Sequence, residues 1–165
     1  MFLGEEEIRR LIREKQILAP VEEGQIQPAG VDLRIDELYV FASSGKLEIQ
    51  RRDNPSLAKV SPNREGKYEV LPRKSYVFST IEEVNMPLNL LGVLFPRSTL
   101  IRSGVIIGSA LVDPGYVGKL HMLMFNSSEF PFEVERGARV AQISFSKVEG
   151  ISKGYSGYYQ GGRVI

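Results

Sequence analysis

The feature that most constrains the fold is a series of short segments rich in β-branched and aromatic residues. Turn-forming residues separate them, for example at Ser43-Ser44-Gly45, Asp113-Pro114-Gly115 and Asn126-Ser127-Ser128. β-branched and aromatic residues favour strands, and many short strands at this spacing are typical of all-β folds. The predicted strands are residues 31–41, 67–71, 75–81, 90–95, 105–108, 119–125, 131–135 and 139–145. The pattern predicts a β-barrel or a β-sandwich.

The N-terminal segment 1–18 differs from this pattern and predicts a short helix. Ile8, Leu11 and Ile12 follow the i, i+3, i+4 spacing of an amphipathic helix, and residues 5–7 are all glutamate. Acidic residues in the first turn interact favourably with the helix dipole. The helix is predicted over about residues 5–15, before Ala19-Pro20 breaks the pattern.

The chain length of 165 residues fits a single domain over 1–165, with no internal repeat. Residues 50–66 are polar and contain proline, so we expect a surface excursion there. Residues 151–165 are rich in glycine, tyrosine and serine and lack strand alternation. They predict either a loose tail or a flexible flap that closes over a ligand.

Composition excludes several classes of active site. The chain has no cysteine and one histidine, His121, which lies in the middle of a predicted strand. Disulfides, thiolate zinc sites and cysteine nucleophiles are excluded, and a Ser-His-Asp triad is disfavoured. Catalysis must use carboxylates, hydroxyls, basic side chains, backbone amides, or a metal held by oxygen.

Charge and hydropathy indicate the expected partners and compartment. The net charge is +1, so no global field attracts nucleic acid or an acidic membrane surface. No apolar run approaches the roughly 20 residues of a membrane span, and the N-terminus lacks the layout of a signal peptide. We expect a soluble cytoplasmic protein without nucleic-acid or membrane partners.

The segment FPRSTLIRSG (95–104) is a candidate anion site. It places Arg97, Ser98, Thr99 and Arg102 close together before Gly104. Guanidinium groups, hydroxyls and exposed backbone amides bind anions such as phosphate. Taken alone, the segment is more typical of a helical turn with solvated arginines.

Two predicted strands carry polar residues whose role the pattern leaves open. In QPAGVDLRI (27–35), Asp32 and Arg34 share one face, where we expect an exposed salt bridge. In RGARVAQISF (136–145), Gln142 lies between apolar neighbours. It could bind a ligand or lie on an edge strand.

Asp113 has two interpretations. Asp-Pro-Gly is common turn chemistry, in which the aspartate bonds its own backbone. A carboxylate that activates water instead needs a fixed position in a shielded pocket. Taken alone, the sequence favours the turn.

Taken in order, the segments QPAGVDLRI, PRSTLIRSG, VDPGYVGKLHMLMFN, RGARVAQISF and YYQGGR resemble the motif series of the dUTPase and dCTP deaminase superfamily. The N-terminal helix resembles that of the deaminase branch, so the resemblance covers nearly the whole chain. It implies a distorted antiparallel β-barrel or jelly-roll, usually a homotrimer with active sites at subunit interfaces. It also implies a pyrimidine deoxynucleoside triphosphate as substrate, bound with Mg²⁺.

The resemblance assigns roles to individual residues. Those near the phosphates would be Arg97, Ser98, Thr99, Arg102 and Gln142, with Ser98 and Arg102 also contributing to catalysis. At the C-terminus, Tyr159, Gln160 and Arg163 would close over the triphosphate.

The remaining assignments concern the sugar, the base, the water and the metal. Tyr116 matches the tyrosine that packs against deoxyribose, and Asp113 matches the carboxylate that activates water in dUTPases. Backbone groups of the strand pair after Asp113 would read the pyrimidine edge. Asp32 would lie in the second shell of Mg²⁺.

One position separates the two reactions. In dCTP deaminases the strand after the Asp-Pro-Gly turn carries the glutamate that activates water, and Leu123 stands there in this chain. A leucine cannot transfer a proton, so the sequence favours hydrolysis of dUTP to dUMP and pyrophosphate, with water activated by Asp113. Two alternatives stay open: a dCTP deaminase, mono- or bifunctional, and a catalytically silent dUTP-binding regulatory protein. The turn and the helix resemble the deaminase branch, and the tail lacks the phenylalanine-containing final motif of trimeric dUTPases.

Overall fold

Strands dominate the computed structural model, which describes residues 1–150 and 153–163. The helical elements are α1 (Glu5–Lys15), the 3-10 turn η1 (Glu23–Gln25) and the short helix α2 (Ser98–Arg102). The strands are β1 (Leu18–Ala19), β2 (Ile26–Gln27), β3 (Gly30–Phe41), β4 (Lys46–Leu47), β5 (Arg52–Asp53), β6 (Leu57–Val60), β7 (Lys67–Val70), β8 (Ser75–Asn85), β9 (Leu90–Pro96), β10 (Val105–Gly108), β11 (Val117–Asn126), β12 (Phe132–Glu135) and β13 (Arg139–Lys147). Each strand predicted from the sequence is present, and the mostly-β fold class is confirmed.

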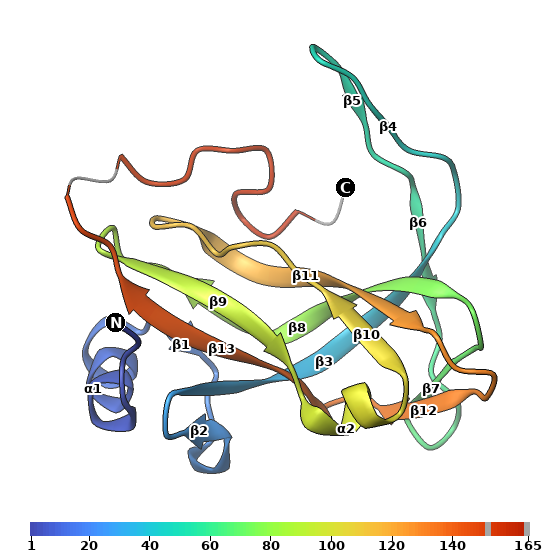
Figure 1. Cartoon of the computed structure of the whole chain (residues 1–165), viewed down its shortest axis with the longest axis horizontal. Helices are drawn as coiled ribbons and strands as arrows, with labels where there is room; N and C mark the ends of the chain where they lie inside the picture. Colours follow the sequence, from blue (N-terminus) through green and yellow to red (C-terminus); the bar gives the residue numbers. More distant parts are fainter. Residues whose placement is uncertain (151–152, 164–165) are drawn as a thin grey trace.

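The main sheet is antiparallel and nearly closes on itself. Its path is β10-β11-β8-β3-β13-β9, and β1, β2 and β6 pair with strands of this path to make nine strands. Helix α2 joins β9 to β10, and Gly92 pairs with Val112 in an isolated bridge. These connections bring the two ends of the path together, as Figure 1 shows. The predicted barrel is confirmed.

The core follows from alternation along β8 and β11, which pair with each other in the sheet. In β8, Tyr76 and Phe78 point inward, and in β11, Met122 and Met124 do the same. Side chains at every second position of a strand share one face. The positions between them on β11, which include His121, therefore face away from this core.

Helix α1 spans Glu5–Lys15, as the sequence predicts. Ile8 and Leu11 are buried, while the outer face carries ion pairs from Arg9 and Arg10 to glutamates. Figure 1 shows the helix beside β13, where Leu3 N–H donates to Phe145 O at 2.9 Å. In the part of the chain that the structure describes, helices are too short or too polar to cross a bilayer.

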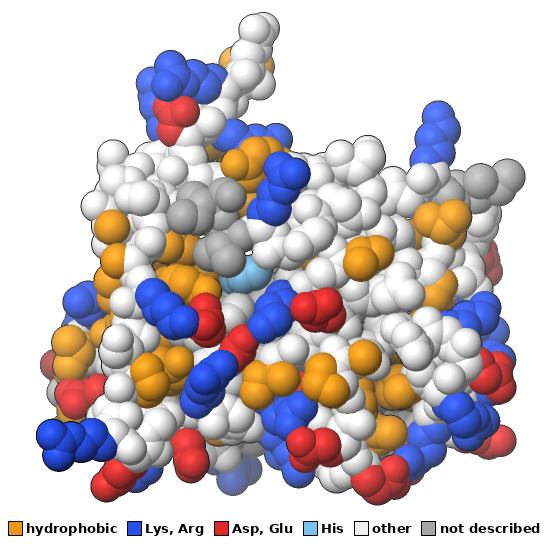
Figure 2. All heavy atoms as spheres, turned by 180° about the vertical axis from the view of Figure 1, so that it is seen from behind, with side chains coloured by type: hydrophobic (Ala, Val, Ile, Leu, Met, Phe, Trp, Pro, Cys, Tyr) orange, Lys and Arg blue, Asp and Glu red, His pale blue; other side chains and the backbone are white. Residues whose placement is uncertain are grey.

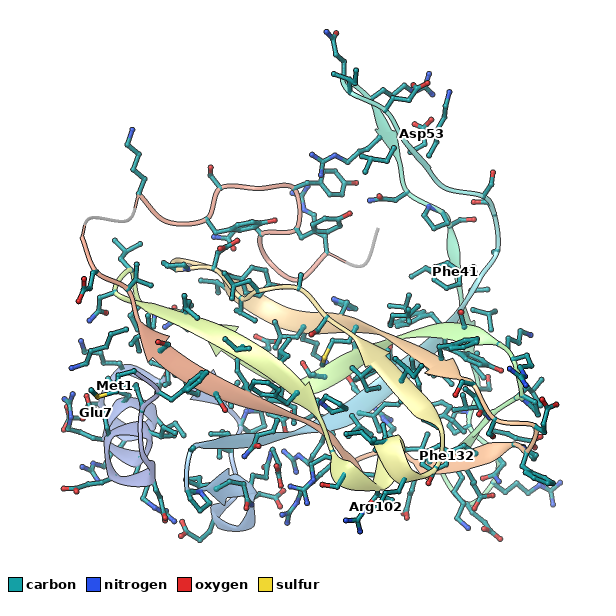
Figure 3. All side chains as sticks on the ribbon, in the orientation of Figure 1. Met1, Glu7, Phe41, Asp53, Arg102 and Phe132 are labelled. Carbon is teal, nitrogen blue, oxygen red and sulfur yellow. The ribbon has the colours of Figure 1, made fainter. Side chains whose placement is uncertain are left out.

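Residues 46–60 form an arm that projects from the barrel (Figure 1). Strands β4 and β5 pair with each other, and β6 pairs with β3 through Leu38–Phe41. Asp53 marks the projecting part in Figure 3. The sequence did not predict these short strands, because the segment is polar, has no aromatic residue and has only Ile49 and Val60 as β-branched residues.

Candidate functional site

A cavity of about 320 Å³ lies between the Asp-Pro-Gly turn, β11 and the C-terminal segment. The turn region contributes residues 110–113 and Tyr116, and the barrel contributes Leu94, Leu120 and His121. The C-terminal segment adds Tyr155, Tyr159 and Arg163. The cavity is mostly apolar with a few polar side chains, as small-molecule sites are.

The Asp-Pro-Gly turn fixes where Asp113 lies but leaves its carboxylate unused. Tyr116 N–H donates to Asp113 O at 3.1 Å, and Gly115 has φ +80°, the conformation that a type II turn requires at this position. Among the described residues the Asp113 carboxylate has no hydrogen-bond or ion-pair partner. The turn therefore explains the Asp113 backbone and not its half-buried side chain, which lines the cavity.

Two tyrosines form a rigid wall of the cavity. Tyr116 Oη donates to Lys119 O at 2.6 Å, and the Tyr116 and Tyr155 rings meet edge to face with centroids 5.7 Å apart. Burial, and to a lesser degree Tyr155, raises the pKa of the Tyr116 hydroxyl, which is therefore neutral at physiological pH. Both the apolar face and the fixed hydroxyl are available to position a ligand.

His121 lines the same cavity, although the sequence analysis assigned it no role. Its imidazole is half-buried, and Figure 2 shows it reaching the molecular surface. Neither ring nitrogen has a hydrogen-bond partner in residues 1–150 and 153–163. Burial, and secondly the charge of Lys119, lowers the pKa of His121, so the imidazole is neutral at pH 7. Alternation along β11 accounts for the outward direction of His121, whereas the cavity beside it depends on the turn and the C-terminal segment.

The C-terminal segment docks on the turn through Gln160. Its Oε1 accepts from Val117 N–H at 2.9 Å, and its Nε2 donates to Gly115 O at 2.9 Å. Gly161 N–H donates to Val117 O at 2.8 Å, and Tyr155 N–H donates to Pro114 O at 2.6 Å. Backbone groups after Asp113 are thus satisfied by the chain's own tail.

Close approach of the tail requires glycine at position 118. Gly118 has φ +133°, and a Cβ there would lie 2.4 Å from Gly162 N, far inside van der Waals contact. The arm also contacts the tail, because Tyr159 Oη donates to Asn54 Oδ1 at 3.2 Å. Opening and closing of a flap stays a prediction, and residues 151–152 and 164–165 of the predicted flap lie outside the described residues.

The residues predicted to bind phosphate lie elsewhere in the chain. Ser98, Thr99 and Arg102 are exposed on α2, and Figure 3 shows Arg102 pointing away from the barrel, at the end remote from the C-terminal segment. The cavity that holds Asp113 is lined by none of Arg97, Ser98, Thr99, Arg102 and Gln142. Within one chain, the side chains predicted to bind phosphate therefore lie apart from Asp113, the predicted water-activating carboxylate.

Asp32 is buried, and the expectation of an exposed salt bridge was wrong. Its side chain has no exposure, and Oδ2 accepts from Arg97 Nη1 and lies 3.6 Å from Arg139 Nη1. Oδ1 has no partner in the described part of the chain. The strand face is covered by other segments, so Asp32 holds Arg97 in place.

A second buried carboxylate, Glu82, lies next to this pair. Glu82 Oε1 accepts from Arg34 Nε at 2.7 Å and from Gln25 Nε2 at 2.8 Å, and Oε2 accepts from Arg34 N–H at 2.9 Å. Gln25 Nε2 also donates to Asp32 O at 2.7 Å, which links the two pairs. The sequence analysis missed Glu82 and Gln25, although alternation along β8 places Glu82 on the inward face with Phe78.

Two further predictions concern positions outside the cavity. Gln142 was expected to bind a ligand or lie on an edge strand; β13 pairs with both β3 and β9, so the edge interpretation is wrong. Its half-buried carboxamide has no hydrogen bond within the described residues. Leu123 faces outward on β11 opposite Gly108 and has 37% exposure, and it adds no proton-transfer group.

The described residues build no metal cage of their own. In residues 1–150 and 153–163, no group of three or more His, Cys, Asp or Glu side chains is placed to hold a metal ion. The Asp32 carboxylate already faces the guanidinium groups of Arg97 and Arg139, so it is suited to pairing with arginine rather than to binding a metal ion. Magnesium usually binds through one or two carboxylates plus substrate phosphates, so such an ion would enter with its nucleotide.

Comparison with known proteins places the chain in a defined family. The family model described as dCTP deaminase-like matches residues 2–148. The chain is 35% identical to a probable deoxyuridine 5'-triphosphate nucleotidohydrolase of Methanothermobacter thermautotrophicus, over 97% of this chain and 99% of that protein. It is 36% identical to a dCTP deaminase of Pyrococcus furiosus, over 91% of this chain and 88% of that protein.

The fold has a counterpart among solved structures. A dCTP deaminase from Agrobacterium tumefaciens superposes with a TM-score of 0.68 at 21% identity. The match covers 87% of this chain and 47% of that one. The superposition supports the fold, and the sequence relatives support the family.

Proposed function

This chain belongs to the dCTP deaminase-like family, and we propose that within it the protein is a dUTP pyrophosphatase that releases dUMP and pyrophosphate. The observation that carries the proposal is a combination of two positions. The Asp113 carboxylate has no partner among the described residues, and the side chain at Leu123 is apolar. A water molecule can lose its proton to Asp113, whereas Leu123 has no group that could take part in deamination.

The proposed reaction begins with water held by the Asp113 carboxylate. The water oxygen forms a bond to the α-phosphorus while its proton passes to Asp113. The bond from the α-phosphorus to the α,β-bridging oxygen breaks, and its electron pair leaves with pyrophosphate. The substrate is magnesium-bound dUTP, in which the ion offsets phosphate charge.

Phosphate charge in the transition state also requires protein donors. We assign this to Arg97, Ser98 and Arg102 of a second copy of the chain, with Asp32 holding Arg97 in position. An oligomeric site, in a homotrimer by the family resemblance, accounts for the distance between α2 and the cavity within one chain. Exposed apolar residues on α2 and on the strands next to it offer a surface for such contacts: Phe95, Ile101 and Ile106.

A product assay tests the reaction. Incubation with dUTP and Mg²⁺ in ¹⁸O-labelled water is expected to yield dUMP that carries one ¹⁸O and pyrophosphate that carries none, because water attacks the α-phosphorus. Incubation with dCTP is expected to release ammonia far more slowly. Label in pyrophosphate, or no turnover at all, would contradict the proposal.

A complementation experiment tests the shared site. Asp113→Asn and Arg102→Ala are each expected to be nearly inactive alone, because each removes one half of every site. Co-expressed chains that assemble together should regain activity, because some sites then combine an intact Asp113 with an intact Arg102. Mixtures that stay inactive while native mass spectrometry shows mixed oligomers would exclude a shared site.

A dCTP deaminase is the second candidate, favoured by the 36% identity to the Pyrococcus furiosus protein of that name. Ammonia released from dCTP at a rate comparable to dUTP hydrolysis would support it. Tight binding of dUTP without any product would instead support a silent regulatory protein.

A further inference from the structure

The backbone beside the cavity is partly occupied by the chain's own tail. Gly115 O and both backbone groups of Val117 are bonded to the tail through Gln160 and Gly161. A backbone N–H donates one hydrogen bond, whereas a carbonyl oxygen has two lone pairs. While the tail is docked, the Val117 N–H is therefore not available to a nucleobase, and each of the two carbonyl oxygens keeps one acceptor position.

The start of β11 is satisfied in the same way. Lys119 O accepts from Tyr116 Oη at 2.6 Å, and Leu120 N–H donates to Thr80 Oγ1 at 3.1 Å. This is where β11 has a register shift against β8, between Lys119 and His121. The Leu120 N–H is thus not free to donate to a base, while Lys119 O keeps one acceptor position.

His121 is the polar side chain on this wall that remains free. It lines the cavity, and both ring nitrogens lack partners among the described residues. Its side-chain neighbours on the barrel wall, Leu94 and Leu120, are apolar and cannot hydrogen-bond. A half-buried polar group without a partner gains when a ligand supplies one.

We propose that a ring nitrogen of His121 hydrogen-bonds the pyrimidine base of the bound nucleotide. The proposal deepens the proposed function and rests on it, because it takes the ligand to be a pyrimidine nucleotide. It adds a side-chain contact to the backbone recognition of the base that the family resemblance implies.

The chemistry of the imidazole indicates which bases it accepts. A neutral imidazole has one N–H donor and one nitrogen acceptor, and no group of the described residues fixes which nitrogen carries the proton. Uracil presents an N3–H donor beside the O4 acceptor, and cytosine presents the N3 acceptor beside an amino donor. The ring can satisfy either base, so His121 should strengthen binding of uracil and cytosine nucleotides alike.

A comparison of ligand affinities between the wild type and a His121 variant tests the contact without requiring turnover. The probes are α,β-imido-dUTP, α,β-imido-dCTP and 2-deoxyribose 5-triphosphate, which lacks a base, measured by calorimetry on the full chain. His121→Val is expected to weaken both imido nucleotides about threefold to tenfold, the range for one net hydrogen bond. The same variant should bind the abasic triphosphate as the wild type does.

Matched variants separate recognition from packing. His121→Asn keeps a donor and an acceptor and should recover most of the affinity. Phe125→Leu changes the same face of β11 outside the cavity and should bind all three probes normally. Equal weakening of the abasic probe and the nucleotides by His121→Val would overturn the proposal.

The wild-type protein offers a second measurement. Because His121 is the chain's one histidine, its imidazole signals in NMR are assigned without ambiguity. The uracil nucleotide should shift these signals, and the abasic triphosphate should not. Shifted signals in a protein that fails to hydrolyse dUTP would retain this proposal and reject the proposed function; unshifted signals in an active enzyme would do the reverse.

Discussion

The carboxylates in two regions of the molecule differ in whether they have a charged partner. In the buried ion-pair network, defined as Gln25, Asp32, Arg34, Glu82 and Arg97, each carboxylate faces a guanidinium group. In the cavity, Asp113 and His121 have no hydrogen-bond or ion-pair partner among residues 1–150 and 153–163. Charges that are paired inside a fold contribute to its specific structure, whereas unpaired ionisable groups in a cleft are typical of functional sites. The two regions should therefore respond differently to isosteric removal of charge.

The largest effect is expected from Glu82→Gln in the network. The substitution leaves the Arg34 guanidinium, whose side chain is 14% exposed, without its buried carboxylate. Breaking a buried pair by removing one partner costs about 3–5 kcal/mol of unfolding free energy. Denaturant unfolding followed by circular dichroism measures the loss.

The matched control is Glu83→Gln, the same change one residue later on the exposed face of β8. It should alter the unfolding free energy by no more than about 0.5 kcal/mol. Equal losses in the two variants would show that the network is no more important to stability than a surface carboxylate.

The cavity should give the reverse result with Asp113→Asn. Loss of the proposed base is expected to lower kcat by about 100-fold or more, because general-base catalysis contributes at least that factor. Unfolding free energy should change by less than about 0.5 kcal/mol, since the carboxylate has no partner to lose. Initial-rate kinetics and denaturation on the same sample, with Asp53→Asn on the arm as control, decide the matter; unchanged turnover would exclude Asp113 as the base.

The sequence predicted the framework of the barrel because alternation and turn residues are local signals. It failed where the covering of a strand face depends on distant segments. Alternation put Asp32 and Arg34 on one face of β3, but the burial of that face depends on Arg97, Arg139 and the turn that carries Gln25. Such burial is a tertiary property that a strand's own pattern does not contain.

The candidate site was predicted in part for a similar reason. The Asp-Pro-Gly turn and Tyr116 are readable as motifs, and both line the cavity. That the Asp113 carboxylate lacks a partner, and that His121 joins it, depends on how β11 and the tail meet. The tail docks through backbone groups and the Gln160 amide, which leave no periodic signal in a glycine-rich segment.

A smaller effect is expected from loosening the tail that closes this region. Gln160→Ala removes the hydrogen bonds to Val117 N–H and Gly115 O. The local opening free energy should fall by about 1 kcal/mol, the net value of a typical hydrogen bond, which is roughly a fivefold faster exchange of the Val117 amide. Hydrogen exchange followed by NMR measures it, with Gln50→Ala in the exposed loop as control; equal exchange rates would show that Gln160 does not hold the tail.

The smallest effect concerns pH. Two titrating groups, Asp36 and His121, are expected to affect the unfolding free energy over different pH ranges. Asp36 on β3 is not a member of the network: burial opposes its ionisation, but hydrogen bonds from Lys119 and Arg136 lower its pKa below 3.8 on balance. Its contribution to stability is therefore present above about pH 4 and is lost only as pH falls below that value. The cavity residue His121 affects stability at a higher pH.

His121 titrates in that higher window. Burial first, and Lys119 second, lowers its pKa below 6.5 in the folded state, so the unfolded chain takes up the proton first as pH falls. Stability associated with the neutral ring is complete above about pH 6.5 and declines below it. Asp113, Arg163 and the tyrosines that line the cavity share this environment. The wild type is therefore compared with a variant that differs from it only at position 121. Between about pH 7.5 and 5.5 the wild type should lose more unfolding free energy than His121→Val; parallel curves, or a wild type that gains stability on acidification, would show that the imidazole is not buried as a neutral group.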